Sequence, residues 1–165
     1  MSNARNYIQA RNLLEEARTR LKDFEAIMGR VRKEFDSLRE TGVSCPAFKE
    51  DGEIARIIQV TKQCWNHLFK HPIKRPSRVE KLERALCFDM AVKLLQKTTT
   101  YQEVSKEKNS GGSEYLYFGI IGYIRGNRIK VIIRKQLKHT NPQYVLFSFY
   151  QMSSGPLKNA PRIDS

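Results

Sequence analysis

The spacing of the apolar residues changes near residue 98, and this change restricts the folds that the chain can adopt. Before it, apolar residues recur every three to four positions, as in helices; after it, apolar and polar residues alternate, as in strands. The alternating runs cover residues 98–105, 114–124, 128–135 and 144–151. Gly126 and Asn127 separate the second run from the third, and both residue types accept the positive φ angles of a tight hairpin. Helices followed by consecutive strands predict an α+β fold with a four-stranded antiparallel sheet.

Two helices are predicted immediately before the sheet. One covers residues 53–70, with Asp51 as its N-cap and Pro72 beyond its end, and the other covers residues 78–97. Apolar side chains form one stripe along each helix. We therefore expect both helices to pack on one face of the antiparallel sheet.

A seven-residue repeat of apolar side chains occupies residues 7–38. Its two columns are Tyr7, Leu14, Leu21, Met28 and Phe35, and Ala10, Ala17, Phe24, Val31 and Leu38. The repeat predicts a long helix, or a helical hairpin bent at Gly29, whose apolar seam packs on its own chain, on a partner helix or on a second copy. We accordingly expect a helical arm at residues 1–41, a linker at 42–52, an α+β domain at 53–153 and a disordered tail at 154–165.

The composition favours a polyanionic partner. The chain has 30 Lys and Arg against 17 Asp and Glu, a net charge of +13, so nucleic acid is the first candidate. A hydrophobic fraction of 40% suffices for a core and argues against intrinsic disorder. No segment resembles a signal peptide or the roughly 20 apolar residues of a membrane span, so we expect a cytoplasmic protein without membrane contact. Its three widely spaced cysteines suit neither a disulfide framework nor a zinc site.

Alternation assigns the side chains of the strands to two faces. One is expected to be apolar and to face the helices, with Leu116, Phe118, Ile120, Ile124, Ile129, Val131, Ile133, Val145, Phe147 and Phe149. The opposite face, called the outer face below, is expected to carry Tyr115, Tyr117, Gly119, Ile121, Tyr123, Lys130, Ile132, Arg134, Tyr144, Leu146, Ser148 and Tyr150. Aromatic rings stack on bases and cations neutralise phosphates, so this face suits RNA or single-stranded DNA. An ordinary solvated sheet face is the alternative.

Two of the three histidines, His67 and His71, are four residues apart at the end of the first predicted helix and therefore share one face. Arg75 follows four residues later. The spacing alone would allow a metal site, but no third ligand stands at a supporting position, so no metal is expected. His67 can also be interpreted as a residue at the helix C-terminus that the helix dipole favours.

Imidazoles also suit the cleavage of RNA without a metal ion. That reaction needs a base for the ribose 2′-hydroxyl, an acid for the leaving oxygen and cations for the developing phosphorane charge. Lys130 and Arg134 would hold the phosphate, and Ser148 or Tyr150 would orient it. Further contacts with RNA are expected from Arg75, Arg128, Tyr117 and Tyr123. Gly119 would leave room for a ligand on the outer face.

The stretch CWNHLFKHPIKRPSRVEKLERALCFDMAVKLL, followed by RIKVIIRKQ and YVLFSFYQ, resembles the phage-associated and toxin-type members of the barnase, EndoU, colicin and RelE-like (BECR) endoribonuclease group. The resemblance covers residues 54–152 and excludes the arm. It implies cofactor-free cleavage of RNA, such as tRNA or mRNA, by a toxin that an antitoxin or immunity protein restrains. It gives His67 or His71 a proton-transfer role, Arg134 the phosphate contact, and Ser148 with Tyr150 substrate positioning. Glu103 is a spare candidate for the general base.

Two other functions are open at this stage. The outer face can hold RNA or single-stranded DNA without cleaving it, or the arm can dock a partner while the rest of the chain serves as an adaptor. An acidic antitoxin that covers the basic face follows from the nuclease hypothesis, because a cytoplasmic nuclease must be neutralised in its own cell.

Overall fold

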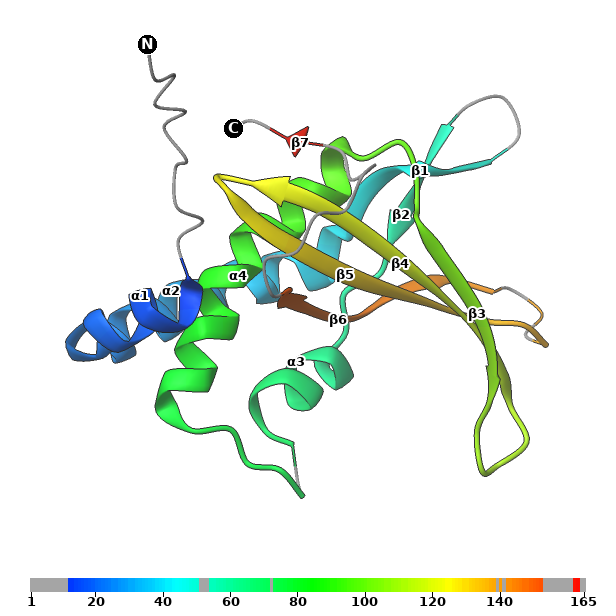
Figure 1. Cartoon of the computed structure of the whole chain (residues 1–165). Helices are drawn as coiled ribbons and strands as arrows, with labels where there is room; N and C mark the ends of the chain where they lie inside the picture. Colours follow the sequence, from blue (N-terminus) through cyan, green and yellow to red (C-terminus); the bar gives the residue numbers. More distant parts are fainter. Residues whose placement is uncertain are drawn as a thin grey trace, which may run out of the picture.

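The computed structural model describes residues 12–50, 54–71, 73–138, 140, 142–152 and 162–163 and has the secondary structure of an α+β protein. Its helices are α1 (Leu13–Thr19), the 3₁₀ turn η1 (Leu21–Asp23), α2 (Phe24–Thr41), α3 (Lys62–Phe69) and α4 (Arg78–Lys97). Its strands are β1 (Val43–Glu50), β2 (Ile54–Ile58), β3 (Glu103–Lys108), β4 (Glu114–Ile124), β5 (Asn127–Gln136), β6 (Tyr144–Gln151) and β7 (Arg162–Ile163) (Figure 1). The predicted fold class is confirmed, and α4, β4 and β6 have the bounds that the sequence predicts.

The larger sheet has the strand order β3-β4-β5-β6 with antiparallel neighbours, and β7 pairs in parallel with the end of β4. Arg125 (φ 50°) and Gly126 (φ 77°) form the turn between β4 and β5. The predicted hairpin is confirmed, but its turn lies one residue earlier than expected. Asn127 is buried as the first residue of β5, where its side chain donates to the Arg125 carbonyl (3.3 Å) and accepts from Gln151 Nε2 (2.9 Å).

Strands β1 and β2 form a second, two-stranded antiparallel sheet, in which Val43 pairs with Ile58 and Glu50 with Ile54. Strand β1 occupies residues 43–50 of the segment predicted as a linker, and the helix predicted at 53–70 is wrong over residues 54–58, which form β2. A short run of β-branched residues has no decisive period of its own, and pairing with the preceding strand, β1, determines its conformation. Asp51, the expected N-cap, lies outside the described residues.

Helix α3 begins only at Lys62 because the chain first runs beside β6. The Gln59 amide donates to the Tyr144 carbonyl (2.8 Å), and the Leu146 amide donates to the Gln59 carbonyl (2.9 Å). Thr61 then caps the helix by accepting a hydrogen bond from the Cys64 amide (3.3 Å). These bonds place the start of α3 at the β6 edge of the sheet (Figure 1).

The helical arm packs on its own chain. It breaks at η1 rather than at Gly29, which lies inside α2, and the Leu13 amide at its start donates to Gln151 Oε1 (2.9 Å). The Phe35 ring is fully buried 5.1 Å from the Trp65 ring of α3 and 5.8 Å from the Phe88 ring of α4. The apolar seam of the described arm therefore belongs to the main core; residues 7–11 of the repeat lie outside the described residues.

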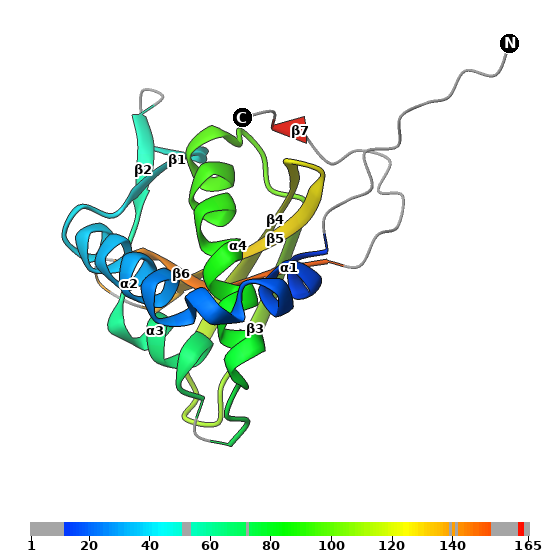
Figure 2. The same cartoon turned by 90° about the vertical axis from the view of Figure 1, so that its left-hand side faces the viewer.

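Helix α4 lies between the arm and the larger sheet (Figure 2). Its Phe88 ring is 6.0 Å from the Phe149 ring of β6, and the same core contains Ile120 and Val131 from β4 and β5. The opposite side of the sheet carries Tyr117, Lys130 and Arg134, which are only half-buried. The outer face therefore carries polar and charged side chains that solvent can partly reach.

The three cysteines are free and buried. Burial raises the pKa of Cys45 to about 11 and that of Cys64 to about 12, and it also raises the pKa of Cys87. Thiols of this kind are poor nucleophiles because the reactive form is the thiolate. None of the described helices is both long enough and apolar enough to span a bilayer.

Candidate functional site

Strand β6 contains a bulge that changes the composition of the outer face. Ile132 of β5 pairs with Ser148, but the next residue, Ile133, pairs with Leu146. Phe147 is therefore the extra residue of the bulge. Strict alternation cannot continue through such a position, so the residues before it exchange faces relative to the sequence prediction.

The predicted faces of residues 144–147 are wrong for this reason. Leu146 is buried in the core, and the Tyr144 ring packs 4.6 Å from Phe48, also in the core. Phe147 instead contacts Tyr117 of the outer face, with ring centroids 5.4 Å apart. Ser148 follows the bulge and keeps its predicted position opposite Ile132.

Phe147 connects the histidines to Arg134. The His67 ring stacks on it with centroids 4.9 Å apart and an interplanar angle of 27°. The Arg134 guanidinium carbon lies 5.0 Å from the centroid of Phe147 and 4.6 Å from that of Tyr115. His67 and Arg134 thus both contact the Phe147 ring. We call His67, His71, Tyr117, Arg134 and Phe147 the His67–Arg134 cluster.

Positive charge surrounds the His67 imidazole. Burial lowers its pKa, and the charges of His71, Arg84 and Arg134 lower it further. A helix C-terminus alone would have the opposite effect, so the dipole does not dominate here. Among the described residues no carboxylate forms an ion pair with His67 or Arg134. The cluster therefore presents a neutral imidazole in a positive field, which suits an anionic ligand.

His71 shapes the loop that follows α3. Its Nδ1 accepts hydrogen bonds from the amides of Ile73 (3.3 Å) and Lys74 (3.1 Å). In the neutral ring the proton is therefore on Nε2, which can donate to a ligand. The ring lies 5.9 Å from that of His67, and the loop exposes Lys74 and Arg75.

Lys130 lies apart from the imidazoles. It is four residues from Arg134 on the same face of β5, about 13 Å away at a rise of roughly 3.3 Å per residue. It forms an ion pair with Glu103 of β3, which crosses over Gly119 of β4. Burial acts to lower the pKa of Lys130, but hydrogen bonds with Glu103 and Tyr150 raise it overall. The ion pair fills the space predicted to be open above Gly119, and the spare base Glu103 is already paired.

Arg128 and Tyr123 pair at the other end of the outer face. Arg128 is six residues from Arg134 along β5, which corresponds to about 20 Å. The structure thus brings His67, His71, Arg134 and Tyr117 together in one cluster. Lys130 lies outside this cluster, beside Tyr150. It does not bring Arg128 and Tyr123 into the His67–Arg134 cluster.

Sequence reasoning missed two residues that organise the cluster. Phe147 was assigned to the core, and no local signal in β6 marks the bulge that turns it outward. Arg84 of α4 was not considered; its guanidinium donates to the Leu68 carbonyl at the end of α3, which links the two helices, and its charge lowers the pKa of His67. His67 and Arg84 belong to different helices, and their proximity depends on how α3 packs beside α4, which no spacing in the sequence reveals.

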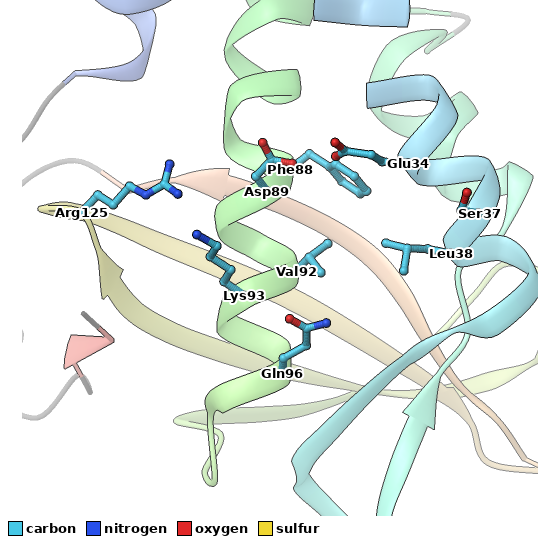
Figure 3. A pocket seen from close by; sticks show the side chains of 9 residues that line it. All are labelled: Glu34, Ser37, Leu38, Phe88, Asp89, Val92, Lys93, Gln96 and Arg125. Carbon is cyan, nitrogen blue, oxygen red and sulfur yellow. The ribbon is translucent and has the colours of Figure 1, made fainter. Parts of the chain in front are cut away.

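A groove of about 490 Å³ lies between α2 and α4, away from the His67–Arg134 cluster (Figure 3). Arg30 joins the carboxylates of Glu34 (3.1 Å) and Asp89 (3.2 Å) at this groove. Burial, assisted by Asp89, raises the pKa of Glu34. The lining includes no histidine, so this groove supplies none of the proton-transfer groups considered above.

Within the part of the chain that the structure describes, no group of three or more His, Cys, Asp or Glu side chains is placed to hold a metal ion. Comparison of the chain with protein-family models, with curated proteins and with solved structures finds no match. The interpretation of the site therefore depends on its own geometry.

Proposed function

We propose that this chain is a metal-independent endoribonuclease of the toxin type, with the His67–Arg134 cluster as its active site. One observation carries the proposal: the His67 imidazole, whose pKa is lowered, and the Arg134 guanidinium, which has no carboxylate partner among the described residues, contact the same aromatic ring. A base and a phosphate-binding cation are the groups that cleavage by the 2′-hydroxyl requires. The net charge of +13 supplies the long-range attraction for RNA.

In this proposal His67 accepts the proton of the ribose 2′-hydroxyl, and the oxygen attacks the adjacent phosphorus. Arg134 stabilises the additional negative charge of the phosphorane, while Nε2–H of His71 donates to a phosphate oxygen. The bond to the 5′ oxygen breaks, that oxygen takes a proton from water, and a 2′,3′-cyclic phosphate remains. Ser148, beside Phe147 in β6, positions the nucleotide.

The wider substrate surface follows the outer face. We infer that α4 covers the inner face of the larger sheet while α3 lies along its β6 edge, which leaves the outer face to RNA such as tRNA or mRNA. Lys130 and Tyr150 then contact the RNA beyond the cleavage site, Arg75 contacts it from the loop after α3, and Arg128 from the far end of β5. An acidic antitoxin that covers this basic face would block the same contacts.

Incubation of the purified protein with total RNA in EDTA tests the proposal directly. We expect cleavage fragments whose 3′ ends carry 2′,3′-cyclic phosphate, because attack by the 2′-hydroxyl forms that group. Intact RNA under conditions where the protein binds it would contradict the proposal and identify a binding module instead. Such binding would weaken with rising salt.

The pH dependence of cleavage should reflect the lowered pKa of His67. A base acts in its neutral form, so the rate should rise with pH and reach half of its plateau below pH 6.5, the ordinary pKa of histidine. An NMR titration of the imidazole protons should locate the same midpoint. In Arg134→Met the midpoint of His67 should move upward, since one of the charges that lower it is gone. A His67 midpoint at or above 6.5 in the natural protein would contradict this assignment.

A further inference from the structure

The ion pair between Glu103 and Lys130 crosses β4 at Gly119, a position that has no side chain. A Cβ atom at residue 119 would lie 2.8 Å from Glu103 Oε2 and 3.2 Å from Lys130 Cε. Both distances are shorter than ordinary van der Waals contact, so the side chains of the pair would have to shift if residue 119 carried a Cβ atom. The pair therefore occupies the space above Gly119 on the outer face.

The two partners differ in how firmly they are held. The Lys130 side chain is 17% exposed, whereas that of Glu103 is 52% exposed on the edge strand β3. Lys130 also interacts with Tyr150 of β6, so it keeps a second partner when the carboxylate leaves. The ammonium group is thus a fixed cation, and the carboxylate is an anion that another anion can replace.

Lys130 and Arg134 face the same side of β5 with one intervening outer-face residue, Ile132. Their separation of about 13 Å is one that a short single strand of RNA spans while it crosses the sheet. Arg134 has no anionic partner among the described residues, whereas Lys130 already holds one. In the free protein, Lys130 is therefore paired with an anion, and Arg134 on the same face of β5 has no anionic partner among the described residues.

We propose that Lys130 with Tyr150 is a second phosphate subsite, and that Glu103 occupies it in the free protein until a phosphate of single-stranded RNA displaces the carboxylate. This inference rests on the proposed function, because it assumes that RNA crosses the outer face from the His67–Arg134 cluster. In this inference Glu103 is an anionic residue that competes with RNA for Lys130. It lowers the affinity for RNA and takes no part in proton transfer.

The test measures binding to RNA that cannot be cleaved. The probe is a fluorescein-labelled, mixed-sequence single strand with a 2′-O-methyl group on every ribose, and anisotropy gives its affinity for the full chain. Glu103→Gln should bind it about two- to five-fold more tightly, the range expected when one exposed ion pair no longer competes. Lys130→Met should bind it more weakly and should lower the slope of log K against log salt by about 0.7.

Two further variants separate a local effect from a change of net charge. Glu40→Gln removes the same charge from an exposed position on α2 and should leave the affinity unchanged. In the double variant with Lys130→Met, Glu103→Gln should no longer tighten binding, because the two residues act through the same contact. Equal tightening by Glu40→Gln and Glu103→Gln, or tightening that persists without Lys130, would overturn the subsite.

The outcomes also separate this inference from the proposed function. Binding that follows the expected pattern together with intact natural RNA would support the subsite and remove the nuclease. Cleavage of natural RNA, without any effect of Glu103→Gln on binding of the probe, would support the nuclease and overturn the subsite. No binding of the probe by the natural protein would overturn the subsite.

Discussion

The variant His67→Ala should lower the rate of RNA cleavage by about 10²- to 10⁴-fold, the usual contribution of a positioned general base. The affinity for the 2′-O-methylated probe should change little, because Arg134 and Lys130 still supply the phosphate contacts. Single-turnover cleavage and anisotropy measure the two quantities separately. A large loss of rate with preserved binding assigns His67 to the chemical step.

Asn66→Ala is the matched control, since it removes a polar side chain from the neighbouring position of α3. It should leave the rate within about two-fold of the natural protein, as expected for a substitution away from the reacting groups. Thermal unfolding of both variants establishes that α3 is intact. If His67→Ala cleaves RNA at the natural rate, the imidazole is not the base and the proposed mechanism is wrong.

The variant Phe35→Ala should lower the free energy of unfolding by about 3–5 kcal/mol, because it leaves a cavity in the centre of the core. The ring is fully buried between Trp65 of α3 and Phe88 of α4. Urea unfolding, followed by far-ultraviolet circular dichroism, measures the change. The effect tests whether α2 is part of the main core or a separate arm.

Glu40→Ala serves as the control on the same helix. Its side chain is exposed, so the free energy of unfolding should change by less than about 0.5 kcal/mol. A loss below about 1 kcal/mol in Phe35→Ala would mean that α2 contributes little to the core, contrary to its burial here. An independent transition for the arm would have the same meaning.

Local patterns predicted the elements whose periods are long and regular. Helix α4 (20 residues) and strand β4 (11 residues) begin and end as expected, because a long run of one period outweighs any competing pattern. Strand β6 also has its predicted bounds, although a bulge interrupts its alternation. Strand β3 starts five residues later than predicted, since the chain after α4 is first held by the Thr98 hydroxyl, which donates to the Thr100 carbonyl (2.8 Å). Strand β2 was predicted as helix because its five residues are too few to show a decisive period, and its conformation depends on pairing with β1.

The candidate site follows the same division. The sequence indicated the residue types, a histidine pair and a basic, tyrosine-rich sheet face, because composition and alternation are local properties. It did not indicate Phe147, on which His67 and Arg134 meet, since a bulge arises from the register between two strands. The ion pair of Lys130 with Glu103 could not be predicted either, because it forms between β5 and β3 across the intervening strand β4.

The amino-acid sequence by itself determined the α+β class, the positive charge and the chemical groups on offer, since each depends on residues close together in the chain. The tertiary structure alone decided that the arm joins the core, that Phe147 turns outward and that Glu103 covers Lys130. Each of these outcomes depends on contacts between segments that are distant in sequence. Such contacts depend on packing and strand-pairing energies between residues that are far apart in the chain. A short stretch of sequence therefore does not predict them.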